Sequence, residues 1–558
     1  MRIALALFSA LALASCGPSG PDGPVNVAII GDADSLVSSG MRLSPAGQHY
    51  RAATAEGLVT IDDAGNVVPA LAERWIVTDD GLSYIFRLRN SDWPSGASMT
   101  ADDIRTALRR NMRDLRGTSL GLDLSKVDEI RDMTGRVIEV TLTSPQPDFL
   151  RLLAQPEMGI LQDGAGAGPM VRSDQTDAQP LLLEPIPPEA RGFPAREQWQ
   201  SRTRRVAVSA MSATAAVEAF SDGEIDLVLN GTLANLPLAD TGPLTRGTIR
   251  LDAALGLFGL VFRSDDGFLS EPVNRQALGL AINRENLLQP FNVGGWQSSS
   301  WIIPQELAAG EAALGDRWAN LSLEQRREIA GRRVAAWESA DGKELVLRIG
   351  LPEGPGSDTL FEQMNEGLSQ IGITAIRTGL GEGAELELHD RLARFYSPRW
   401  FLNQFHCRLE LGLCSEEVDD LVEQSIVERE TTVKAQLLAA ARRVVRHPEV
   451  VVERADLPRM PEVIIAELVG VPIHPAVRRR LVRLIRPPVT PIGQVGGRKM
   501  LVVRDVRVER PHALPAVAQT ARVPRAFLHR PQRGQQDPHQ HSDNRHHHKQ
   551  LNQCKRVI

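Results

Sequence analysis

The sequence predicts an α/β protein in which helices form layers on sheets. Two stretches carry this prediction, since each reads as a helix, a glycine and then a strand. One helix stops at Asp222-Gly223 before the apolar run Ile225–Leu229, and the helix Leu360–Ile371 is followed by Gly372 and the start of a strand. Glycine readily ends a helix, and alternating helices and strands are typical of α/β layers. The length of 558 residues exceeds one hydrophobic core and predicts two or three domains.

The first third of the chain can be assigned element by element. Val25–Gly31 is β-branched and apolar, which predicts a buried strand, and a short helix is expected near Tyr50–Leu58. Apolar runs on both sides of the Asp-Asp-Gly sequence at 79–81 predict a β-hairpin. Thr100 and Ser98 precede two aspartates and an amphipathic segment, so one of the two is expected to cap a helix. The alternating run Val137–Leu142 predicts a further strand.

The first sixteen residues have the composition of a secretion signal. Arg2 precedes an apolar run of eleven residues, Ile3–Leu13, which is shorter than the roughly 20 residues that cross a bilayer. This pattern predicts a signal peptide over 1–15. The sequence Leu-Ala-Ser-Cys at 13–16 resembles the bacterial lipobox, which implies that Cys16 carries the lipid, palmitate included. An ordinary signal peptide and a buried helix are the alternatives.

Acylation of Cys16 would tether the protein on the periplasmic side of a bacterial membrane, inner or outer, through a flexible linker over 16–24. An oxidising compartment also favours a disulfide between Cys407 and Cys414, with two free thiols as the alternative. A metal site at these cysteines is not expected, because a structural zinc needs four ligands.

The C-terminal tail differs from the rest of the chain in charge. Residues 447–558 hold 20 Lys and Arg against 9 Asp and Glu, whereas the preceding residues carry a net charge of -17. The atypical segment 446–558 is rich in His and Pro and reads as disordered. Three interpretations stay open: a metal- or anion-binding appendage that uses His539, His541 and His546–His548, a divergent extension, or a slip of the reading frame near residue 445.

Six blocks in order resemble family 5 of the extracellular solute-binding proteins, the peptide- and nickel-type receptors of ABC importers. They are PALAERWIVTDDGLSYIFRLR (69–89), WPSGASMTADDI (93–104), AGAGPM (165–170), AAVEAFSDGEIDLVL (215–229), VNRQALGLAINRENLL (273–288) and LRIGLPEGPGSDTLFEQMNEGLSQIGI (347–373). The resemblance implies a two-lobe periplasmic-binding-protein fold of type II, with a third subdomain and a hinge between the lobes. We therefore expect lobe I at 25–55 plus 165–255, the additional subdomain at 56–164 and lobe II at 256–445.

Motifs of catalysis are sparse in the sequence. It has no Gly-x-Ser-x-Gly elbow, no His-Glu-x-x-His and no phosphate loop, so an enzyme is not expected, nor are a cofactor, a resident metal or nucleic acid binding. Binding is expected at two places. Asp32, Asp34 and Ser35 follow the first strand, whose carboxyl end should open onto a cleft. Trp400, Asn403 and Gln404 lie in an aromatic segment that the resemblance places beside the hinge, with ordinary core packing as the alternative.

The expected function is therefore that of a lipid-anchored, monomeric substrate-binding protein. It would capture an oligopeptide or another small solute by lobe closure and deliver it to an ABC permease and its ATPase. A nickel-chelate receptor and a periplasmic chaperone or scaffold on the same fold are the alternatives.

Overall fold

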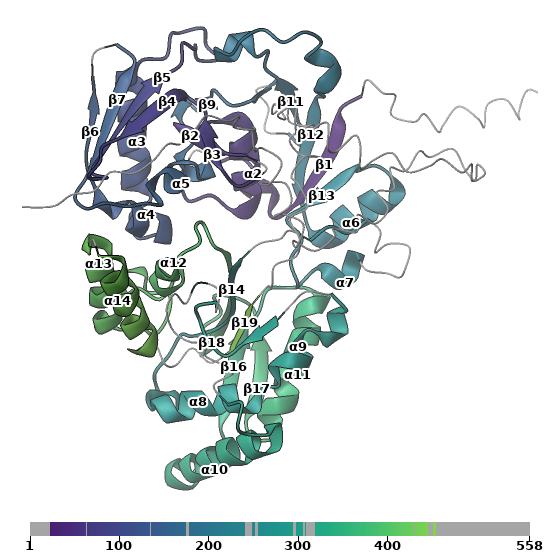
Figure 1. Cartoon of the computed structure of the whole chain (residues 1–558). Coiled ribbons are helices and arrows are strands. Elements are labelled where there is room, and N and C mark those ends of the chain that lie inside the picture. Colours follow the sequence, from purple (N-terminus) through teal and green to yellow (C-terminus); the bar gives the residue numbers. More distant parts are fainter. Residues whose placement is uncertain are drawn as a thin grey trace, which may run out of the picture. The chain divides into compact units, whose positions relative to one another are not determined.

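The protein is described by a computed structural model, which covers residues 23–453 with gaps (Figure 1). The gaps are 39, 63, 134, 174–177, 240–247, 252–254, 294–296, 305–306, 308–317, 429 and 445–449. The expected signal peptide, Cys16 and residues 454–558 lie outside the described residues. No helix in the described part of the chain combines the length and the apolar composition of a membrane span.

The first sheet has five strands in the order β10-β11-β12-β1-β13. Their bounds are β1 Val25–Ile30, β10 Met170–Arg172, β11 Leu181–Pro185, β12 Val206–Met211 and β13 Leu227–Leu229. Strand β1 pairs in parallel with β12 and β13, and its apolar side chains form one core cluster with those of β11 and β12. The predicted buried strand at 25–31 is confirmed. Helix α2 (Pro45–Thr54) begins earlier than expected, because Ser44 caps it and Pro45 fits its first turn.

Helix α6 (Ala213–Asp222) connects β12 to β13 as the sequence predicts. Its C-cap is Gly223, whose φ of 76° is the left-handed conformation that glycine adopts most readily. The backbone N–H of Glu224 then donates to the carbonyl of Ala219 at 2.9 Å, which closes the last turn.

The second sheet is antiparallel, with the order β4-β5-β7-β6. The strands are β4 Ala72–Val77, β5 Ser83–Leu88, β6 Val127–Asp132 and β7 Val137–Leu142, and two short ribbons accompany them: β2 Val59–Ile61 with β3 Val67–Pro69, and β8 Leu161–Gln162 with β9 Ala165–Gly166. The predicted hairpin is confirmed, since Val77 pairs with Tyr84 around the turn at 79–81. Helices α4 (Ser119–Asp123), η2 (Leu124–Lys126), α5 (Phe149–Leu153) and η3 (Pro156–Met158) belong to the same part of the chain.

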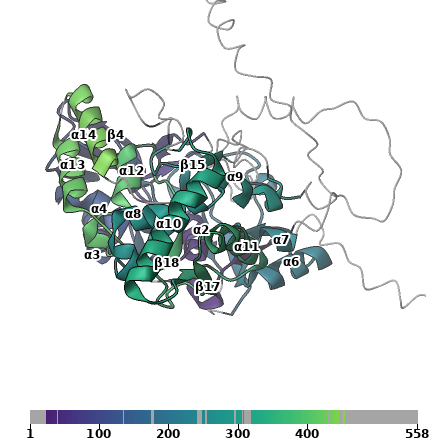
Figure 2. The same ribbon diagram turned by 90° about the horizontal axis from the view of Figure 1, so that it is seen from below.

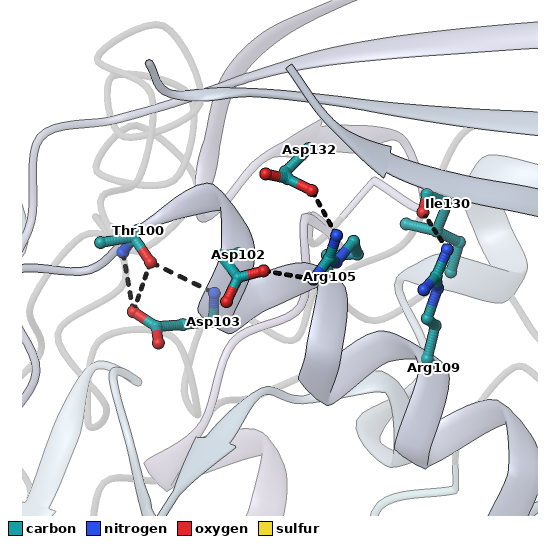
Figure 3. A network of polar contacts seen from close by, with 7 residues as sticks. All are labelled: Thr100, Asp102, Asp103, Arg105, Arg109, Ile130 and Asp132. Atoms are coloured by element: carbon teal, nitrogen blue, oxygen red, sulfur yellow. Dashed lines mark hydrogen bonds and ion pairs between the residues drawn. The ribbon is translucent and has the colours of Figure 1, made fainter. Parts of the chain in front are cut away.

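Helix α3 (Ala101–Asp114) is fastened to this sheet by the polar network drawn in Figure 3. Thr100 accepts from the N–H of Asp103 at 3.2 Å while the Asp103 carboxylate accepts from the N–H of Thr100 at 3.0 Å, so the predicted cap is confirmed. One turn later, Arg105 bonds Asp102 and reaches Asp132 of β6, and Arg109 Nη2 donates to the carbonyl of Ile130 at 2.7 Å.

The third sheet is mixed and has six strands in the order β15-β19-β14-β18-β16-β17. The strands are β14 Gly256–Phe262, β15 Gln297–Ser299, β16 Val346–Gly350, β17 Thr374–Thr378, β18 Leu386–Leu392 and β19 Val450–Glu453. Strand β19 lies beyond the expected limit of lobe II at residue 445, and it pairs with β14 and β15. The helices here are α7 Leu236–Ala239, α8 Pro272–Ala281, α9 Arg284–Leu287, α10 Leu323–Asp341 and α11 Pro355–Ser369, with α8 packed against both α10 and α11 (Figure 2).

Three helices follow β18: α12 (Pro398–Asn403), α13 (Glu416–Val427) and α14 (Thr431–Val444). Their apolar side chains, Trp400 and Val422 among them, belong to the same core cluster as the second sheet and Phe149. The end of the segment expected to be lobe II therefore shares its core with the segment expected to be the additional subdomain. The division into lobes itself stays a prediction.

Candidate functional site

The carboxyl end of β1 carries three of the residues predicted to bind a ligand. Because β1, β12 and β13 are parallel, their carboxyl ends meet at one edge of the first sheet. The short helix η1 (Ala33–Ser35) follows β1 directly. Asp32 and Asp34 are exposed there and Ser35 is half-buried. Ligands of open α/β sheets commonly bind at this edge.

Hydrogen bonds from three directions fix the backbone of this loop. Ser35 Oγ donates to the carbonyl of Asp32 at 2.7 Å, and Ser44 Oγ donates to the carbonyl of Ser35 at 3.0 Å. Gln179 joins the loop to β12, since its Nε2 donates to the carbonyl of Ala33 at 2.9 Å and its Oε1 accepts from the N–H of Ala210 at 2.7 Å. The loop is thus held in place while its two carboxylates stay in contact with solvent.

Arg51 of α2 holds the next part of the same loop from the inside of the protein. Its side chain is buried, and Nη2 donates to the carbonyls of Ser38 at 2.6 Å and Gly40 at 3.2 Å. Burial lowers the pKa of Arg51, and the negative charge of Glu157 opposes that effect. A buried guanidinium that satisfies two carbonyls is a rigid support for a loop.

Glu157, whose charge acts on Arg51, joins Gln48 of the same helix to a distant part of the chain. Its Oε1 accepts from Gln48 Nε2 at 3.1 Å and from Arg394 Nη2 at 3.4 Å. Arg394 follows β18 of the third sheet, and its Nη1 donates to Ser119 Oγ of α4 at 2.8 Å. We call Gln48, Arg51, Ser119, Glu157 and Arg394 the polar junction. It brings together side chains from the segments expected to be lobe I, the additional subdomain and lobe II.

No motif in the sequence indicates the polar junction. Gln48 and Arg51 read as ordinary helix residues, and Glu157 stands in a short apolar stretch without a motif. Arg394 lies two residues before Tyr396, where the aromatic segment begins, and this neighbourhood is the one signal that could have pointed to it.

The second group of predicted ligand residues is buried. Trp400, Asn403 and Gln404 are 1%, 5% and 3% exposed. Trp400 packs edge-on against Phe401 with ring centroids 4.9 Å apart, and Gln404 Nε2 donates to the carbonyl of Trp400 at 3.0 Å. In this conformation the three side chains fill the core, which was the alternative that the sequence left open. The exposed aromatic of the segment is Tyr396, at 50%.

Two histidines in the described part of the chain, His389 and His406, are buried. Burial lowers the pKa of His389 on β18 to about 4, so its imidazole is neutral near pH 7. His406 Nδ1 lies 3.1 Å from an Asp419 carboxylate oxygen. Within the described ranges, no group of three or more His, Cys, Asp or Glu side chains could hold a metal ion.

The structure links Cys407 and Cys414 by a disulfide, with Cα atoms 5.1 Å apart. The closed loop is fastened at both ends. The N–H of Cys407 donates to the Asp419 carboxylate at 3.0 Å, and the N–H of Leu413 donates to the carbonyl of Phe262 at the end of β14 at 3.0 Å. The loop therefore connects the start of α13 to the third sheet.

Comparisons of the sequence find one family model and several curated relatives. The model described as "Bacterial extracellular solute-binding proteins, family 5 Middle" matches residues 66–393. The peptide transport periplasmic protein SapA of Salmonella typhimurium is 25% identical over 275 residues, which are 43% of this chain and 49% of that protein. The probable deoxycholate-binding periplasmic protein YgiS of Escherichia coli is 32% identical over 121 residues, which are 18% and 23% of the two chains. The matched part spans about half of SapA and less of YgiS.

Solved structures share the fold over most of their length. OppA of Burkholderia pseudomallei has a TM-score of 0.64 at 17% identity, over 78% of this chain and 94% of that chain. OppA of Haemophilus influenzae in complex with RPPGFSPFR gives 0.65 at 16% identity with the same coverage. NikA of Brucella suis in complex with Fe(III)-EDTA gives 0.59 at 16% identity, over 77% and 94%. These structures share the two-lobe α/β fold expected from the sequence.

Proposed function

Because the chain belongs to family 5 of the bacterial extracellular solute-binding proteins, we propose that it is the solute receptor of an ABC importer on the periplasmic side of a bacterial membrane. The match of the family model over residues 66–393 carries this proposal. The solute is peptide-like or another small molecule, and the protein delivers it to the permease and ATPase without covalent chemistry.

Capture depends on a solute that contacts two parts of the chain. A ligand favours the closed conformation only by as much as it binds that conformation better than the open one. The loop with Asp32, Asp34 and Ser35 is one contact, since its backbone is held and its carboxylates are exposed. The second contact is the segment after β18, which offers the half-exposed Tyr396 ring and the Arg394 guanidinium. Trp400, Asn403 and Gln404 support that segment from the core.

Several classes of solute are compatible with this fold. Printed names among the relatives include glutathione-binding and dipeptide-binding proteins, and one solved neighbour is a complex with Fe(III)-EDTA. We favour a peptide-like solute, because the exposed Asp32 and Asp34 could pair with an ammonium group. A nickel-chelate receptor is the alternative that uses the same fold.

A thermal-shift screen of the purified full chain tests the proposal. Peptide and metal-chelate libraries are the two arms, and a saturable rise in melting temperature with one class identifies the solute. The double variant D32N/D34N should lose most of that rise, and the matched control D128N, which changes an exposed aspartate of β6, should keep it. If no solute shifts the melting temperature and the chain instead suppresses aggregation of an unfolded client, the chaperone alternative replaces the receptor.

A further inference from the structure

Asp123 is a buried carboxylate between two helical segments that are far apart in the sequence. It is 2% exposed at the end of α4, and its Oδ1 accepts from Asn403 Nδ2 of α12 at 2.8 Å. Its backbone carbonyl accepts from Gln146 Nε2 at 2.9 Å. The other carboxylate oxygen, Oδ2, is buried and has no hydrogen-bond partner among the described residues. A buried carboxylate oxygen without a partner is costly and calls for an explanation.

A small cavity lies beside this carboxylate, between η2, α12 and α13. The space open to the centre of a water molecule is about 10 Å³, which is close to what one buried water needs. His406 also lines the cavity, and its Nε2 is a second buried nitrogen or oxygen atom without a partner in the part of the chain that the structure describes. Asn403 and Arg399 complete the polar part of the wall.

The surroundings of the cavity favour a proton on the carboxyl group of Asp123. Arg399 is buried, lies 3.9 Å from Asp148 Oδ2 and also acts on Asp123, with Arg394 as the second cation near Asp123. Arg151 and Lys434 act on Asp148 as well. The neighbouring cation, Arg394, is already bonded to Glu157. Lys126 and Glu423, of opposite sign, line the cavity as well, and His406 is paired with Asp419. Burial of Asp123, together with the negative charge of Asp148, outweighs the nearby cations and favours the protonated form of the Asp123 carboxyl group.

We propose that this cavity is a binding site for one water molecule and one proton, and that it latches α12 and α13 onto the α4–η2 segment. The water bridges Asp123 Oδ2 and His406 Nε2. The proton resides on Asp123, whose neutral carboxyl group then donates to the water while Oδ1 still accepts from Asn403. Loss of the proton leaves a buried charge in its place and weakens the hold on the two helices.

Burial raises the pKa of Asp123 to about 6, and Arg399 and the Asn403 hydrogen bond oppose that rise. A carboxyl group whose pKa is higher in the folded chain than in the unfolded chain binds its proton preferentially on folding. Its contribution to stability is therefore complete at low pH and is lost as the pH rises through about 6. The latch should be tighter in mildly acidic than in neutral surroundings.

The variant D123N tests this sign, because an amide imitates the neutral carboxyl group. We expect D123N to melt above the wild-type chain at about pH 7.5, by a smaller margin at about pH 5, and together with it only below about pH 4, where Asp123 is protonated in the folded and the unfolded chain. The matched control D128N carries the same substitution on an exposed residue of β6 and should follow the wild type at each pH. If D123N melts below the wild type by the same amount at each pH, Asp123 is a stabilising ionised residue and the proposal is wrong.

A second measurement uses the wild-type chain alone, so it stands even if the variant folds poorly. Carbon-13 spectra of the chain labelled at aspartate carboxyl groups should show a signal assigned to Asp123 that titrates near pH 6, distinct from those of Asp148 and Asp419, whose pKa values burial also raises. Amide exchange in α13, corrected for intrinsic rates, should be slower below that pH. Ionisation of Asp123 below about pH 5 would overturn the proton site. Unchanged exchange in α13 would overturn the latch. None of these readouts uses a solute, so they do not depend on the proposed receptor function.

Discussion

At the scale of single residues, Glu56 is a buried carboxylate that two arginines share. Arg89 Nη2 lies 2.6 Å from one carboxylate oxygen, and Arg191 bonds the other. The side chains of Glu56 and Arg191 are each 11% exposed and that of Arg89 is 3% exposed. Both guanidiniums lie over the Phe193 ring, at 4.5 and 5.1 Å from its centroid. Burial lowers the pKa of Arg89, and Glu56 counters that effect.

Replacing Glu56 with alanine should therefore destabilise the protein strongly. The buried Arg89 and the largely buried Arg191 would lose their common partner, and loss of a buried partner typically costs about 3–5 kcal/mol. Urea unfolding of E56A against the wild type measures this loss. The matched control is E73Q, whose salt bridge with Arg87 is exposed and should be worth less than about 1 kcal/mol. Equal losses in the two variants would mean that the Glu56 cluster adds nothing beyond a surface pair.

At the scale of elements, the start of α3 shows how local sequence specifies a helix end. The capping box of Thr100 and Asp103 satisfies two N–H groups that the helix itself leaves free. One turn further on, Arg105 and Arg109 fasten the helix to β6 (Figure 3). The cap depends only on residues three positions apart, whereas the fastening depends on a strand more than twenty residues away.

Removal of the cap should have a measurable but moderate effect. T100A is expected to lower the free energy of unfolding by about 1 kcal/mol, within the range of about 0.5–2 for such caps. T100S keeps the hydroxyl oxygen and should stay close to the wild type. Chemical denaturation of the wild type, T100A and T100S measures the three free energies of unfolding. Equal decreases in T100A and T100S would show that the methyl group, not the hydroxyl, stabilises the helix.

At the scale of the whole molecule, the chain crosses between its sheets more than once. Helices α12–α14 lie between β18 and β19 of the third sheet in sequence, yet they share a core cluster with the second sheet. Arg394, which follows β18 of the third sheet, also contacts this part of the chain through hydrogen bonds to Ser119 and Glu157. A change of conformation between the expected lobes would therefore have to break these contacts or carry the contacting segments along together. The polar junction and the Asp123 site both join segments assigned to different expected lobes.

Attachment to a membrane is a second property of the whole molecule. We expect the wild-type chain to fractionate with membranes and to carry lipid mass on Cys16, and C16A to lose both, because acyl chains supply the binding free energy. Cell fractionation and mass spectrometry measure the two properties. C554A removes a cysteine of the tail and serves as the control. A C16A protein that still fractionates with membranes, or a wild-type chain without lipid, would refute the anchor.

The sequence by itself determined the elements whose signals are local, and it identified the family. The buried strand β1, the hairpin at 79–81, the cap at Thr100 and the glycine stop at Gly223 all follow from patterns within a few neighbouring residues. Only the tertiary structure decided which polar residues are buried and paired. Asn403 reads as a ligand contact until Asp123, 280 positions away, is placed beside it. Burial depends on such distant partners, and one sequence contains no record of their distances.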